Sequence, residues 1–160
     1  MIAQNYLKEI FEYKNGNLFW KLQKSNRVKT GDKCGSINSS GYLNAKLDGK
    51  KYLIHRLIFL YHHGFLPKIV DHIDNNILNN KIENLREAND SQSASNIKMP
   101  KTNSSGIKGI SFDKKTKKWH VQLSVNNKKM YFGQYFDKNV AKFVSDTMRY
   151  KYHKEFANNG

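Results

Sequence analysis

The chain has 160 residues, of which 38% are hydrophobic, a size and composition that suit one or two small domains but no large core. Its 28 Lys and Arg residues outnumber 13 Asp and Glu, and the net charge of +15 favours nucleic acid as a partner over a membrane surface or mere solubility. Cys34 is the only cysteine, which excludes an intrachain disulfide, and without a signal segment or long apolar run a soluble cytoplasmic protein is expected.

The first third of the chain predicts short helices and strands in turn. Apolar residues recur at helical spacing over 4–13, and 17–22 resembles a short strand. Asp48-Gly49 predicts a hairpin turn between 42–47 and 51–54, because both residues tolerate the positive φ angles of a type I′ turn. Residues 54–63 predict a helix, for which Gly64 is the expected C-cap.

The stretch from 69 to 96 carries the chemistry. It predicts a strand over 69–72, a loop, a strand over 84–88 and a helix capped by Asp90. Asp71 and His72 end the first of these strands, and Asn84 returns from the second. Oxygen ligands suit a hard divalent metal and a histidine suits the base that activates a water, so the pattern indicates a single-metal phosphodiesterase.

The simpler interpretation of this stretch is that its polar residues form only a loop, because Asn and Asp are common in turns. Four of them are expected to shape the loop rather than to take part in chemistry: Asp74, Asn76, Asn79 and Asn80.

A second module is predicted beyond a polar linker over 99–106, which contains Pro100 and Gly106. Three strands are expected over 106–112, 118–125 and 129–135, followed by a helix over 138–152 that Asp137 caps. The apolar stripe expected to pack this helix on the sheet consists of Val140, Ala141, Val144 and Met148. Residues 99–160 hold thirteen basic and four acidic residues (+9), against fifteen and nine (+6) in residues 1–98.

One face of the predicted sheet should stay bare, since a single helix covers only the other. Strand alternation turns Trp119, Val121 and Leu123 toward the helix. Lysines on the bare face could bind phosphate and a glutamine could contact adenine, although an inert solvated face would look similar. The residues assigned to it are Lys108, Ser111, Lys118, His120, Gln122, Ser124, Lys129 and Tyr131.

Two motifs, Asp-His-Ile-Asp (71–74) and Ile-Glu-Asn-Leu-Arg (82–86), resemble the HNH endonuclease family in the His-Asn-Asn form of phage and intron-encoded homing enzymes. The resemblance covers 1–98 and implies a ββα-metal fold. It implies that His72 is the general base, that Asn84 is the middle Asn that orients the loop or the base, and that Asp71 is a ligand of one Mg²⁺ or Mn²⁺.

The same resemblance implies a second metal ligand on the following helix, with Asn96 preferred and Ser93 as the alternative position. His55-Arg56 also matches the family. Arg56 could reach a phosphate, whereas His55 could equally serve packing or capping. The chain lacks the two cysteine pairs of zinc-stabilised members, so no structural zinc is expected.

The second module resembles the Apetala, or ethylene-response-factor, DNA-binding domain, in which a three-stranded sheet enters the major groove. The resemblance rests on Ser-Gly-Ile-Lys-Gly-Ile (105–110), Lys-Trp (118–119) and Tyr-Phe-Gly-Gln-Tyr-Phe (131–136). Ser111 and Ser124 stand where plant members carry arginines, which predicts looser sequence specificity.

The sequence therefore predicts an α+β chain with a ββα-metal nuclease domain and N-terminal leader (1–98), a linker (99–106) and a small three-stranded antiparallel sheet plus one helix (107–158). The expected activity is that of a homing-type, metal-dependent endonuclease on double-stranded DNA, without a membrane partner and with a monomer favoured. The alternatives are a DNA-binding regulator with a decayed nuclease site and a nonspecific nucleic-acid binder. Ser93 supports the first of these, because family members often carry Asn at its position.

Overall fold

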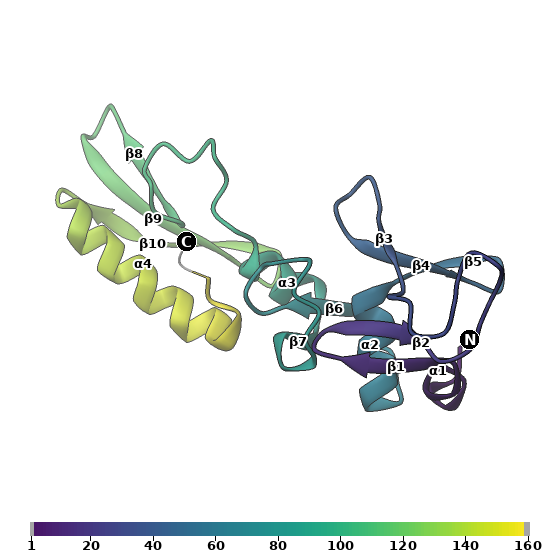
Figure 1. Cartoon of the computed structure of the whole chain (residues 1–160). Helices are drawn as coiled ribbons and strands as arrows, with labels where there is room; N and C mark the ends of the chain where they lie inside the picture. Colours follow the sequence, from purple (N-terminus) through teal and green to yellow (C-terminus); the bar gives the residue numbers. More distant parts are fainter. Residues whose placement is uncertain (1, 159–160) are drawn as a thin grey trace. The chain divides into compact units, whose positions relative to one another are not determined.

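The structure, a computed structural model, describes residues 2–158. The chain divides into two compact units, Met1–Ala88 and Asn89–Gly160 (Figure 1). Each unit combines helices with small antiparallel sheets, as the sequence predicts. The division falls ten residues before the expected one at 98, because the helix that follows Ala88 packs within the C-terminal unit.

The N-terminal unit begins with α1 (Gln4–Ile10) and a hairpin of β1 (Phe11–Lys14) and β2 (Asn17–Trp20). The prediction that the helix continues to residue 13 is wrong, because Phe11 already pairs with Trp20 across the hairpin. Asn15 and Gly16 form the turn with φ of 47° and 79°. A Cβ at Gly16 would lie 2.7 Å from the Lys81 backbone nitrogen, so a glycine is required there.

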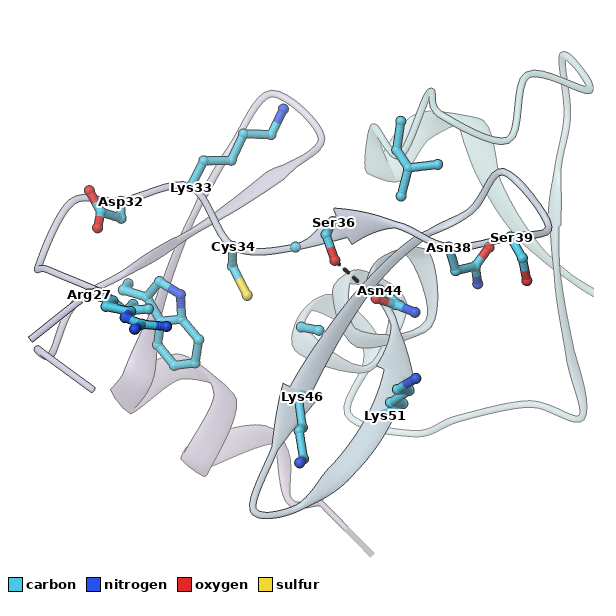
Figure 2. Close-up of a pocket in the computed structure, with 15 residues that line it drawn as sticks. Arg27, Asp32, Lys33, Cys34, Ser36, Asn38, Ser39, Asn44, Lys46 and Lys51 are labelled. Atoms are coloured by element: carbon cyan, nitrogen blue, oxygen red, sulfur yellow. Dashed lines mark hydrogen bonds between the residues drawn. The ribbon is translucent and has the colours of Figure 1, made fainter. Parts of the chain in front are cut away.

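A second sheet has the order β3 (Ser36–Ile37), β4 (Leu43–Leu47) and β5 (Lys50–Leu53), shown in Figure 2. Asp48 and Gly49 form the predicted turn between β4 and β5, with φ of 48° and 83°. α2 (Ile54–His63) follows β5 directly and ends at Gly64, whose φ of 78° confirms the predicted C-cap.

The core of this unit lies where α1, α2 and the β1–β2 hairpin meet. Leu7, Phe11, Leu18 and Ile58 are fully buried there. Burial of each such side chain contributes about 1.5–3 kcal/mol, so this cluster is the main support of the unit.

The two strands that carry the predicted site pack against this core. β6 (Ile69–His72) pairs antiparallel with β7 (Leu85–Ala88), which follows a short 3₁₀ turn, η1 (Ile82–Asn84). Val70 and Leu85 anchor the pair because both are buried in the core. The register sets Asp71 opposite Arg86 and His72 opposite Leu85.

The C-terminal unit begins with α3 (Asp90–Asn96) and continues into a sheet of order β10-β9-β8. Its N-cap is Asn89 rather than the predicted Asp90, because Asn89 and Gln92 exchange side-chain and backbone hydrogen bonds in a capping box. The remaining elements are β8 (Ile110–Asp113), β9 (Lys118–Val125), β10 (Lys128–Tyr135), α4 (Lys138–His153) and η2 (Lys154–Phe156).

Helix α4 covers one face of this sheet and is capped by Asp137, as predicted. Its buried stripe is Ala141, Ser145, Arg149 and His153, whereas Val140 of the predicted stripe is 46% exposed. The last three residues of this stripe are polar. Their burial is possible because each has a hydrogen-bond partner. Ser145 Oγ donates to the Lys108 carbonyl at 2.8 Å, for example.

Three consecutive carbonyls at the C-terminal end of α3 explain why this helix belongs to the C-terminal unit. Arg149 Nη2 donates to Ser95 O, Asn158 Nδ2 to Asn96 O, and Lys108 Nζ to Ile97 O. These groups satisfy carbonyls that a helix end leaves without partners. The residues after α3 also fold within the unit, since Asn103 Oδ1 accepts the backbone N–H groups of Ser105 and Gly106.

No helix in the described part of the chain is both long and apolar enough to cross a membrane.

Candidate active site and DNA-binding surface

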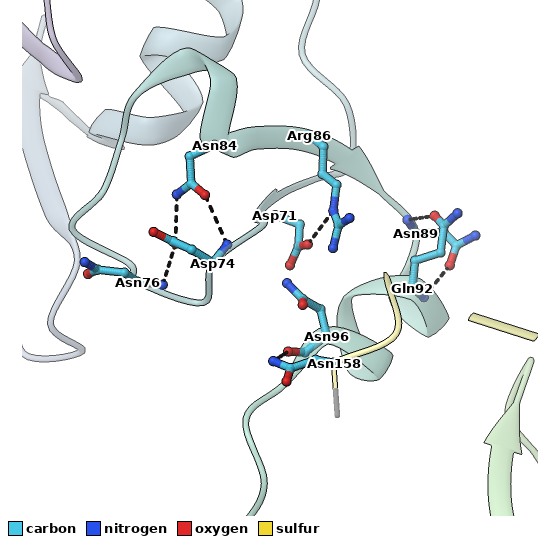
Figure 3. A network of polar contacts seen from close by, with 9 residues as sticks. All are labelled: Asp71, Asp74, Asn76, Asn84, Arg86, Asn89, Gln92, Asn96 and Asn158. Atoms are coloured by element: carbon cyan, nitrogen blue, oxygen red, sulfur yellow. Dashed lines mark hydrogen bonds and ion pairs between the residues drawn. The ribbon is translucent and has the colours of Figure 1, made fainter. Parts of the chain in front are cut away.

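The carboxylate of Asp71 is held from the neighbouring strand. Its Oδ2 accepts a hydrogen bond from Arg86 Nε at 3.0 Å, and the two side chains are only 10% and 14% exposed (Figure 3). The pair follows from the β6–β7 register, which sets these residues opposite each other. Arg86 ends the Ile-Glu-Asn-Leu-Arg motif, but the motif alone does not indicate this contact.

The imidazole of His72 is buried and held by an amide. His72 Nε2 lies 2.9 Å from Asn80 Oδ1, and the two residues are 6% and 2% exposed. An amide oxygen can only accept, so Nε2 is the donor in this hydrogen bond. The expectation that Asn80 only shapes the loop missed this contact, which depends on a fold of the loop that the sequence does not reveal.

Asn84 closes the loop between the two strands. Its Nδ2 donates to Asp74 Oδ1 and to Asn79 O, at 2.9 and 2.8 Å, while its Oδ1 accepts from Asp74 N. Burial alone would raise the pKa of the Asp74 carboxyl, but hydrogen bonds from Asn79, Asn76 and Asn84 together lower it below its ordinary value. Asn84 thereby fixes the path of the loop that carries Asn80.

A second histidine packs against His72. The His55 ring meets it edge-on, with centroids 4.8 Å apart, and the Tyr42 ring lies 5.5 Å from that of His55. Burial lowers the pKa of His55 to about 3, with smaller electrostatic contributions from His72 and Arg56. His55 is therefore a neutral packing partner at physiological pH.

Arg56 stabilises the approach to β6. Its guanidinium donates to Lys68 O at 2.9 Å and to Pro67 O at 3.0 Å. These contacts engage two of the five N–H donors of the guanidinium, and the expectation that Arg56 reaches a phosphate stays a prediction.

The expected metal ligands lie in different units. Asp71 is on β6, whereas Asn96 and Ser93 are on α3 of the C-terminal unit, where Asn96 is 4% exposed and Ser93 is half-buried. Among the described residues, no three His, Cys, Asp or Glu side chains form a group that could hold a metal ion. Carboxylate and amide oxygens, which Asp71 and Asn96 carry, are ligands that Mg²⁺ accepts.

The uncovered face of the C-terminal sheet carries most of the residues predicted for DNA binding. Ser111 pairs with His120, Gln122 with Tyr131 and Ser124 with Lys129. His120 is half-buried, with Nε2 3.5 Å from Asp113 Oδ2, and Lys118 Nζ lies 4.6 Å from the centre of the Phe136 ring. The other residues of these pairs are exposed: Ser111, Gln122, Tyr131, Ser124 and Lys129.

Lys108 does not belong to this face. It is 8% exposed and donates to the carbonyls of Ile97 and Asn158. Burial and the charge of Arg149 lower its pKa to about 8. The prediction was wrong because β8 begins only at Ile110, so the alternation along the strand does not reach Lys108. Gln134, which pairs with His120 beyond a bulge, takes an exposed place that sequence analysis missed.

Comparison with known proteins identifies the class. Residues 52–94 match the family model of HNH endonucleases, a span that holds Asp71, His72 and Asn84 and ends two residues before Asn96. The chain is also 35% identical to Protein 3.8 of Escherichia phage T7 over 96 residues, which cover 59% of this chain and 78% of that protein. The chain is thus a relative of Protein 3.8 that carries an HNH endonuclease domain over residues 52–94, and this domain indicates a DNA endonuclease. No solved structure matches the chain.

Proposed function

We propose that this protein is a homing-type endonuclease, encoded by a phage or mobile element, that hydrolyses phosphodiester bonds in duplex DNA and requires Mg²⁺ or Mn²⁺. One observation carries the proposal: Asp71 and His72 are adjacent on β6 and are each held by a separate partner, the half-buried Arg86 and the buried Asn80. The pair lies in the span that matches the HNH family. A fixed imidazole beside a fixed carboxylate suits activation of a water next to a cation.

In the proposed mechanism His72 is the general base. Asn80 holds the imidazole by accepting from Nε2, and the imidazole takes the proton from the attacking water. Asn84 contributes by holding the loop that carries Asn80. Asp71, with Asn96 or Ser93 as a second ligand, would hold the divalent ion, which supplies positive charge at the scissile phosphate and the leaving oxygen.

The C-terminal unit is proposed to bind duplex DNA in the manner of Apetala-type domains, through the uncovered sheet face. The exposed positions of Gln122, Lys129 and Tyr131 on that face support this assignment. A DNA-binding module tethered to the nuclease raises the effective concentration of the cutting site near bound DNA.

The proposal is tested by incubating supercoiled plasmid with the full chain in Mg²⁺, Mn²⁺ or EDTA. The wild type should nick in either metal and not in EDTA. His72→Ala should lose about 10²–10⁴-fold in rate, since this is what a positioned base contributes. His63→Ala is the matched control, because His63 is exposed on α2, and it should nick like the wild type.

A second candidate is a DNA-binding regulator with an inactive nuclease site. Ser93 at a position where relatives often carry Asn favours it, as does the ion pair in which Asp71 is already engaged. This candidate predicts that the pure wild-type protein binds duplex DNA but nicks plasmid in neither metal.

A further inference from the structure

The N-terminal unit contains an open groove that the proposed catalytic residues do not line. The groove has a volume of about 840 Å³ and lies between the loop after β2 and the β3–β4–β5 sheet (Figure 2). All of its lining residues fall between Trp20 and Lys51, so it is separate from β6 and from the loop that holds His72.

Basic side chains border the groove on both sides. Arg27 and Lys33 come from the loop after β2, and Lys46 and Lys51 come from the β4–β5 hairpin. Asp32 is the only acidic residue in its lining, and its Oδ2 accepts the backbone N–H of Lys29 at 2.7 Å. The groove therefore carries an excess of positive charge and suits an anionic ligand.

The two hairpin lysines are the most informative pair. Lys46 and Lys51 are direct cross-strand partners, both are exposed, and neither forms an ion pair among the described residues. Like charges directly opposite each other destabilise a sheet, and an anion bound beside both would remove that repulsion.

A neutral donor lies beside them. Asn44 is two residues before Lys46 on β4, so its side chain leaves the same face. Its Oδ1 lies 3.5 Å from Ser36 Oγ, which leaves the amide N–H₂ available to a ligand in the groove. Lysines combined with an amide donor form the usual set of contacts to a DNA backbone.

We infer that this groove binds the phosphate backbone of duplex DNA, so that the nuclease unit holds its substrate independently of the C-terminal sheet. The choice of DNA as the polyanion rests on the proposed function. The contacts are to phosphate and are therefore independent of base sequence.

The test uses the full chain in EDTA and measures its affinity for a short fluorescent duplex by anisotropy over a range of salt concentrations. The variant is Lys46→Gln with Lys51→Gln. The control is Lys50→Gln, which removes one positive charge next to Lys51, against two charges in the double variant; Lys50 pairs with buried Leu47 and lies outside the groove. Thermal melting of all three proteins verifies that each is folded.

The double variant should bind more weakly, and its slope of log affinity against log salt should flatten by about two units, since each neutralised phosphate contributes about 0.9. The control should keep the wild-type slope. Equal slopes for all three folded proteins would overturn the inference. That result would be expected if the groove instead binds an acidic protein segment, because duplex binding would then not depend on Lys46 and Lys51. Plasmid nicking is scored separately, so loss of the groove contacts and failure of the nuclease assignment remain distinguishable.

Discussion

Asn80 and Asn84 lie four residues apart, yet they contact different parts of the site. Asn84 bonds Asp74 and the loop backbone, whereas Asn80 contacts His72 itself. A residue that fixes the tautomer of a catalytic histidine acts through that histidine, so Asn80 is a positioning residue for the proposed base.

Asn80→Ala should lower the single-turnover cleavage rate by roughly tenfold or more while leaving duplex affinity unchanged, because partners that orient a functional histidine commonly contribute this much. The pH profile of the rate should also shift, which a merely structural role would not cause. Asn79→Ala is the control, since Asn79 bonds Asp74 rather than the base. Similar rates and pH profiles for both variants would remove Asn80 from the mechanism.

The choice between Asn96 and Ser93 as metal ligand can be made by titration. If Asn96 binds the ion, Asn96→Ala should raise the Mg²⁺ concentration needed for half-maximal nicking, as Asp71→Ala should, and Ser93→Ala should be nearly silent. A carboxylate and an amide oxygen are both acceptable Mg²⁺ ligands, so each loss should weaken binding. A wild-type Mg²⁺ dependence in Asn96→Ala with a shift in Ser93→Ala would reverse the assignment.

Buried His55 should make stability depend on pH. Its pKa is lowered from 6.5 to about 3, so between these values the unfolded chain binds a proton that the folded chain does not. Its contribution is complete above pH 6.5 and falls as the pH drops toward 3, by about 1.4 kcal/mol per pH unit.

Urea denaturation at neutral and mildly acidic pH measures this effect. The wild type should lose more stability on acidification than His55→Gln, which cannot titrate. The lowered pKa of Asp74 causes loss of stability at lower pH in both proteins. An identical decline in wild type and His55→Gln would show that His55 does not remain neutral in the fold.

At the scale of elements, α3 is held by the C-terminal unit through buried polar contacts. Lys108→Met should lower the melting temperature, because it leaves the carbonyl of Ile97 without its charged donor, a loss of about 1–3 kcal/mol, while the carbonyl of Asn158 keeps Arg149 as a donor. Lys129→Met, on the exposed face, should weaken duplex binding and leave melting unchanged. The opposite pattern would return Lys108 to the DNA-binding face.

Elements with strong local signals could be predicted from sequence. α2, β6 and β9 have their predicted bounds, and Gly64 and Asp137 cap helices as expected. The end of α1 was missed, because the apolar spacing around Phe11 fits a helix as well as the hairpin it forms with Trp20. The Asn15-Gly16 turn was the available signal.

Elements defined by distant contacts could not be predicted. α3 belongs to the C-terminal unit through Lys108, Arg149 and Asn158, and the last two lie more than fifty residues further along the chain. The same difference holds for the residues of the candidate site. The local motifs predicted Asp71, His72 and Asn84. The contacts of Arg86 and Asn80 depend on the strand register and on the fold of the loop, which the sequence does not reveal.

At the scale of the whole molecule, positive charge is present in both parts of the chain, +6 over 1–98 and +9 over 99–160. A steep salt dependence of DNA binding would therefore not distinguish a nuclease from a regulator, since every protein that neutralises phosphates shows it. Only chemistry at Asp71 and His72 separates these functions.

The most direct test is the single-turnover rate at which the full chain cleaves plasmid in Mg²⁺, compared between the wild type and His72→Ala at equal duplex occupancy. We predict that the wild type cleaves and that the variant binds equally well but cleaves about 10²–10⁴-fold more slowly. A wild type that binds and never cleaves, or a variant that cleaves at the wild-type rate, would contradict His72 as the base of an active HNH endonuclease.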